Sequence, residues 1–162
     1  MDTGLKRSEE GDALVNGLSE IYTELIAEES RNPENRRHLP HPTCREKGHN
    51  PSCGDEITLE LEVQDGKISD ASFTGNGCAI SQASASLMIN LIKGQTVEKA
   101  ESLIALFQRM IKGETTDADE LEELEDAAAL QSISHMPARV KCALLSWRTL
   151  EKALDKSGKK MT

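Results

Sequence analysis

Three cysteines and one aspartate are the residues of this chain best suited to chemistry. Cys53 stands in the segment NPSCGD, Cys78 in GNGCAIS and Cys142 in ARVKCALLSW, and Asp55 follows Cys53 by two residues. Each cysteine lies at the edge of a predicted helix or strand, so the fold can bring them together. Three thiolates and one carboxylate suit a four-coordinate zinc ion with one exchangeable ligand. The sequence therefore predicts a metal site at Cys53, Asp55, Cys78 and Cys142.

The neighbouring residues give each cysteine a different character. Cys53 lies in a turn, where Gly54 permits the chain to reverse, and this makes it the mobile member of the set. Cys78 directly precedes a predicted helix, whose unpaired backbone amides favour negative charge. Cys142 lies two residues from an apolar helix position on either side, about 200° around the helix from each, so its thiol should point away from the core.

Two cations accompany the third cysteine. Arg139 precedes Cys142 by three residues on the same helical face, and Lys141 directly precedes it. Because three thiolates and a carboxylate leave a zinc site negatively charged, we interpret Arg139 and Lys141 as supporting cations. The alternatives are ordinary buried cysteines, a turn-capping Asp55 and a merely solvated lysine.

A second candidate group lies in the proline-rich residues 30–52. Cys44 occurs there with His38, His41 and His49. No two of these form the closely spaced ligand pair of a tight metal site. We interpret them as surface residues without a metal-binding role.

Composition indicates one domain, which we place over residues 12–155 with flexible tails at 1–11 and 156–162. The chain has 162 residues and is 37% hydrophobic but only 2% aromatic, which favours a helical core of aliphatic side chains. The formal net charge of −9 argues against a nucleic-acid partner, because phosphate binding requires clustered Lys and Arg.

Compartment and redox state follow from what the sequence lacks. No stretch approaches the roughly 18 apolar residues of a membrane-spanning helix, and the first residues do not resemble a signal peptide. We therefore expect a cytoplasmic protein without a membrane partner. Thiols stay reduced in that compartment, so metal binding or catalysis is a better expectation than disulfides.

Hydrophobic periodicity predicts the elements that position the site. Alternation of apolar and acidic residues predicts a strand over 56–63 with its acidic face in water, and Asp65-Gly66 predicts a hairpin to a second strand that ends near Gly75. A third strand can come from the segment before Cys53. Helical spacing predicts five helices, over residues 12–29, 80–93, 97–111, 117–131 and 137–154.

The three cysteine segments, in this order, resemble the U-type iron–sulfur cluster assembly proteins, the group of IscU and the NifU amino-terminal domain. The resemblance covers about residues 50–155. Lys141, rather than a histidine, precedes Cys142, and only Met136-Pro137 stand upstream, which is similar to the SufU branch. The resemblance implies an α+β fold in which a small antiparallel sheet is packed by about five helices.

The same resemblance implies a function. A SufU-type protein is expected to be a zinc-dependent sulfur acceptor, sulfurtransferase-like, that takes persulfide sulfur from a SufS-type cysteine desulfurase for iron–sulfur cluster assembly. Pyridoxal phosphate would belong to the desulfurase. Cys53, as the mobile cysteine, is the expected acceptor. Two alternatives stay open: a scaffold that carries a [2Fe–2S] cluster on the same residues, and an interaction module with a structural zinc.

Overall fold

The computed structural model describes residues 24–52 and 54–161. Residues 24–31 are helical, and the earlier part of the helix predicted over 12–29 lies outside the described residues, as does Cys53. The elements that follow are β1 (Cys44–Asn50), β2 (Asp55–Gln64), β3 (Lys67–Asn76), α2 (Ala79–Ile92), α3 (Val97–Ile111), α4 (Ala118–Leu121), the 3-10 helix η1 (Glu122–His135) and α5 (Pro137–Met161). The predicted α+β class is confirmed.

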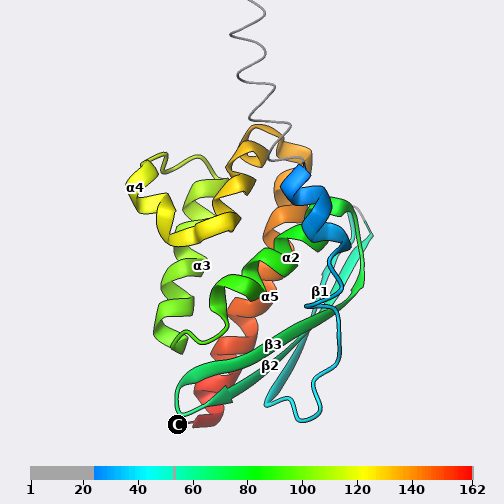
Figure 1. The fold of residues 1–162 in the computed structure, drawn as a ribbon, viewed down its shortest axis with the longest axis vertical. Helices are drawn as coiled ribbons and strands as arrows, with labels where there is room; N and C mark the ends of the chain where they lie inside the picture. The colour runs from blue at the N-terminus through cyan, green and yellow to red at the C-terminus, as the bar shows by residue number, and fades with distance from the viewer. Residues whose placement is uncertain (1–23, 53, 162) are drawn as a thin grey trace, which may run out of the picture.

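The strands form one antiparallel sheet in the order β1-β2-β3 (Figure 1). Asp65 and Gly66 connect β2 to β3 with φ angles of 53° and 75°, the left-handed pair of a tight hairpin, as predicted. β1 is the third strand that the segment before Cys53 was expected to supply. It pairs with the whole first part of β2, from Cys44 opposite Leu61 to Asn50 opposite Asp55.

One face of β2 is buried in the core, but its acidic face does not lie wholly in water. Ile57, Leu59 and Leu61 are buried, as their alternation predicts. Glu60, on the opposite face, is only 5% exposed, because the segment before β1 crosses it and the Leu39 amide donates a hydrogen bond to its carboxylate. The expectation of a fully solvated acidic face is therefore wrong at this position.

The helices form two layers beyond the sheet. α2 packs against β3 and α5, and α5 packs against β1 and β2, while α3 and η1 lie on the far side of these two helices (Figure 1). Phe107 of α3 stacks on Trp147 of α5 with ring centroids 4.0 Å apart. This aromatic pair joins the two helical layers. No helix of the described part of the chain is long and apolar enough to cross a membrane.

The acidic segment predicted as one α-helix over 117–131 is instead a single α-helical turn, α4, followed by η1. Leu124, Ala127, Leu130 and Ile133 are buried at intervals of three residues, which matches the 3-10 repeat and not the α-helical one. The chain also breaks at Glu125, where φ is 51° and ψ is −131°. The Asp117 side chain caps α4 by accepting a hydrogen bond from the Asp119 amide, while the Glu120 carboxylate binds Thr115 and Arg109.

The last helix is longer than predicted and lies very close to the sheet. α5 runs to Met161, past the predicted end at residue 154 and into the segment predicted as a tail. A Cβ atom on Gly48 of β1 would overlap the Thr149 hydroxyl of α5. Glycine at this position therefore permits the close packing of α5 on β1.

Candidate metal centre

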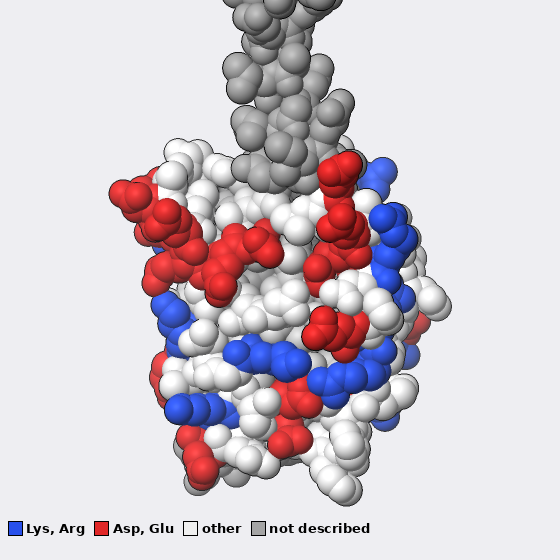
Figure 2. Space-filling model, viewed as in Figure 1, with Lys and Arg blue, Asp and Glu red and all other residues white. Residues whose placement is uncertain are grey.

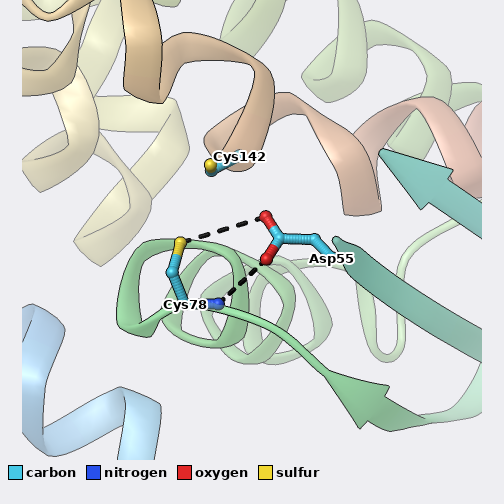
Figure 3. Close-up of side chains that lie close together, drawn as sticks. All are labelled: Asp55, Cys78 and Cys142. Atoms are coloured by element: carbon cyan, nitrogen blue, oxygen red, sulfur yellow. Dashed lines mark hydrogen bonds between the residues drawn. The ribbon is translucent and has the colours of Figure 1, made fainter. Parts of the chain in front are cut away.

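Asp55, Cys78 and Cys142 converge at one end of the sheet (Figure 3). Asp55 begins β2, Cys78 directly precedes α2, and Cys142 lies near the start of α5. One ligand atom from each residue lies within 4.8 Å of those of the others. Cys78 Sγ and Asp55 Oδ2 are 3.9 Å apart, near the roughly 3.3–3.8 Å that tetrahedral zinc bonds impose on neighbouring ligands. The donor set and its spacing fit a zinc ion.

Asp55 is held in place by the backbone around the second cysteine. Its side chain is buried, and its Oδ1 accepts a hydrogen bond of 3.0 Å from the Cys78 amide. A Cβ atom on Gly77 would lie 2.9 Å from the same oxygen. The two glycines before Cys78 serve different purposes. Gly75 has a φ of 134°, whereas Gly77 is needed for space.

Cys78 occupies the position predicted for it, immediately before a helix. It is the N-cap of α2 with φ −69° and ψ 168°, and its thiol is half-buried. The Ser81 hydroxyl donates to the Cys78 carbonyl at 3.0 Å and lies 3.9 Å from its sulfur. Because the first amides of a helix favour negative charge, this position suits a thiolate.

Cys142 points away from the hydrophobic core, as its helical position predicts. The adjoining Ala143 and Leu144 belong to the core cluster, whereas the thiol of Cys142 faces Asp55 and Cys78 (Figure 3). Its residue is nevertheless only 2% exposed. The thiol is therefore enclosed by the candidate centre itself.

The two predicted supporting cations lie at the opening of this centre. Arg139 and Lys141 are exposed and line a hollow of about 510 Å³ together with Ser52, Cys78 and Cys142. Among the described residues, no carboxylate forms a salt bridge with either cation. Their positive charge is thus available to the thiolates, although the compensating role itself stays a prediction.

Cys53 lies outside the described residues, so its place in the centre also stays a prediction. Its neighbour Gly54 has a φ of 70°, the left-handed conformation that permits the predicted turn. Asp55 follows this turn directly and points into the centre (Figure 3).

The interpretation of Cys44 as a surface residue is wrong. Cys44 is 8% exposed on β1, and its thiol lies 3.6 Å from the Ala153 carbonyl of α5. Within the part of the chain that the structure describes, it joins none of His38, His41 and His49 in a cluster that could hold a metal. Its neighbours Thr43 and Arg45 are polar, and β1 was not predicted with defined limits, so no sequence pattern indicated this burial.

Ser84 positions the two helices that carry Cys78 and Cys142, and the sequence did not indicate it. The Ser84 hydroxyl of α2 donates to the Ala143 carbonyl at 2.6 Å and accepts from Trp147 Nε1 at 2.9 Å. Ala143 adjoins Cys142, so this buried bridge ties α5 to α2 one residue from the candidate centre. Such a contact between helices cannot be read from a local pattern.

Replacing Ser84 with alanine should lower the free energy of unfolding by about 1–3 kcal/mol, because two buried polar groups lose their partner. Denaturant unfolding of the metal-free protein measures this. Ser146→Ala is the matched control, since the Ser146 hydroxyl is equally buried but has no hydrogen-bond partner among the described residues. Equal destabilisation by both substitutions would contradict the role of the bridge.

Known proteins resemble this chain in sequence and in structure. The NifU-like N terminal domain family matches residues 21–143. The iron-sulfur cluster assembly scaffold protein IscU of Thermotoga maritima is 46% identical over 84% of this chain and 94% of its own length. The zinc-dependent sulfurtransferase SufU of Bacillus subtilis is 40% identical over 86% of this chain and 92% of its own length.

A solved structure resembles most of this chain. It comes from Fervidobacterium islandicum AW-1 and is described as a candidate iron-sulfur cluster assembly scaffold protein for the SUF system. It has a TM-score of 0.74 and 37% sequence identity, and the match covers 81% of this chain and 94% of that one.

Proposed function

This chain belongs to the NifU-like N terminal domain family, with relatives named IscU and SufU, and we propose that it is a zinc-dependent sulfur acceptor in iron–sulfur cluster assembly. The sulfur donor is a SufS-type cysteine desulfurase, which transfers persulfide sulfur to Cys53. The convergence of Asp55, Cys78 and Cys142 on one point carries this proposal.

The residues of the centre have distinct roles in the proposal. Asp55, Cys78 and Cys142 hold the zinc, and Cys53 is its fourth ligand. Zinc, when bound, stabilises the anionic ligands that the fold brings together and keeps thiols as thiolates. Arg139 and Lys141 offset the remaining negative charge at the opening. In this proposal Cys53 is the mobile ligand that meets the partner, and the left-handed conformation of Gly54, with a φ of 70°, supports the turn that would carry it.

The sulfur-transfer step is a thiol exchange. The Cys53 thiolate attacks the outer sulfur of the persulfide on the desulfurase, and the bond between the two persulfide sulfurs breaks. The desulfurase cysteine leaves as a thiolate, and Cys53 becomes a persulfide. In this proposal Cys53 moves toward the desulfurase to react. The turn before β2 is suited to that movement, whereas Cys78 and Cys142 are fixed to α2 and α5.

A scaffold for a [2Fe–2S] cluster is the second candidate function. The observation that favours it is the 46% identity to a relative named as an IscU scaffold protein. Thiolates with one carboxylate can hold either metal, and Lys141 before Cys142 favours the SufU reading. Anaerobic purification distinguishes the two, because a retained cluster gives a brown protein with stoichiometric iron and sulfide. A colourless protein with one zinc supports the sulfur acceptor.

Cys53→Ser is expected to abolish sulfur acceptance while leaving association with the desulfurase intact. Mass spectrometry of the wild-type protein after reaction with desulfurase and cysteine should place the added sulfur on the peptide that contains Cys53. Cys44→Ala is the matched control, because Cys44 is a buried cysteine outside the metal cluster, and it should accept sulfur normally. Persulfide mainly on the Cys78 or Cys142 peptide would overturn the assignment.

A cytoplasmic location is part of the proposed function.

A further inference from the structure

A second hollow adjoins the candidate centre and has a different character. It has a volume of about 340 Å³ and lies between the end of β1, the segment before Cys53 and the middle of α5. We call it the basic pocket. Its lining includes the polar side chains of His49, Ser52, Lys141, Arg148 and Lys152.

The cations of the basic pocket form a row along one face of α5. Lys141, Arg148 and Lys152 are separated by seven and four residues, which places them within about 40° of one another around a helix. All three are exposed, and no described carboxylate forms a salt bridge with them. Their charges therefore remain available to a ligand.

Two acidic side chains on the neighbouring strands are already paired with lysines. Glu56, opposite His49 in the sheet, forms a 2.6 Å salt bridge with Lys47, and the hydrogen bond and charge of that lysine lower the pKa of its carboxyl. Glu46 on β1 pairs with Lys156 at 2.6 Å. The acid that gives the chain its charge of −9 gathers elsewhere, notably over α4 and η1 (Figure 2). The pocket is thus basic in an acidic protein.

We propose that the basic pocket is the docking site for an acidic surface segment of the protein that delivers sulfur. The inference rests on the proposed function. Ser52 and Lys141 line both the basic pocket and the hollow at the metal cluster. A segment seated in the pocket would therefore lie beside the turn that carries Cys53. Carboxylates on the partner would complement the row of cations, orient the two proteins and accelerate their encounter.

Charge reversal at the far end of the row tests this inference. Arg148→Glu/Lys152→Glu changes the pocket and leaves Lys141 and the metal ligands untouched. We expect the dissociation constant for the desulfurase to rise about tenfold or more at low salt, chiefly through slower association. The difference should shrink at high salt, because these charges are exposed to screening. Sulfur acceptance at saturating desulfurase and the zinc content should stay close to those of the wild type.

The matched control is Lys67→Glu/Lys112→Glu, which makes the same change of charge at two exposed lysines that do not line the pocket. It should bind the desulfurase nearly as well as the wild type. Equal weakening by both double variants would mean a non-specific charge effect and would overturn the inference. Normal binding by the pocket variant would also overturn it. This holds also where an NMR titration shows inorganic phosphate as the only ligand of the wild-type pocket.

The two proposals fail in different ways. If the wild-type protein neither binds the desulfurase nor accepts sulfur, the proposed function fails and the docking inference falls with it. If the wild type binds and accepts sulfur but the pocket variant matches it at every salt concentration, only the docking inference fails.

Discussion

Removing zinc is expected to lower the melting temperature by about 8–16 °C. A ligand present at about 1,000 times its dissociation constant stabilises the folded state by about 4 kcal/mol, and 1 kcal/mol corresponds to about 2–4 °C for a protein of this size. The physical reason is local. Asp55 and Cys142 are buried at 1% and 2% exposure and face Cys78, so without the ion these polar groups stay gathered in a poorly solvated site and lose the bonds that would hold them together.

Scanning calorimetry before and after chelation, with zinc content measured independently, checks this prediction. Cys142→Ser should reproduce the loss in the presence of zinc, because it removes a ligand from the centre. Cys44→Ala should retain the zinc-dependent shift, since this buried cysteine lies outside the cluster. An unchanged melting curve after verified zinc removal would argue against a metal centre that contributes to stability.

Substitution of Asp55 should weaken zinc binding strongly while the fold persists. Asp55→Asn can keep the oxygen that accepts the Cys78 amide hydrogen bond but loses the negative charge, whereas Asp55→Ala loses both. Even partners outside the ligand sphere change metal affinity by about 10–100-fold, so removing the carboxylate should cost at least that much. Sulfur acceptance should fall more than stability does.

Competition with a zinc-binding dye measures the affinity, and unfolding of the metal-free variants measures the fold. In metal-free protein, Asp55→Asn should be more stable than Asp55→Ala, because only alanine leaves the Cys78 amide without its acceptor. If both variants bound zinc and accepted sulfur like the wild type, Asp55 would be only a turn residue.

The secondary structure was predictable wherever a local pattern had a single explanation. The Asp65-Gly66 hairpin follows from residue types that tolerate few other conformations, and it is present. The structure of the acidic segment, predicted as one α-helix over residues 117–131, could not be predicted from its local pattern. Its residue pattern suggested an α-helix, but the buried Leu124 and Ala127 stand three residues apart, which fits η1 against α3. Packing of neighbouring helices selected between two helical repeats of similar local energy.

The sequence by itself determined the residue types of the centre and the element edges at which they stand. Cys78 lies before a helix and Cys142 on the face away from the core, as their local patterns predict. Only the tertiary structure decided that Asp55 and these thiols converge, because that depends on close approaches between distant segments. Gly48 admits α5 onto β1, and Gly77 admits the Asp55 carboxylate. The basic pocket also depends on the tertiary structure, because only the fold places the end of β1 opposite the cations of α5.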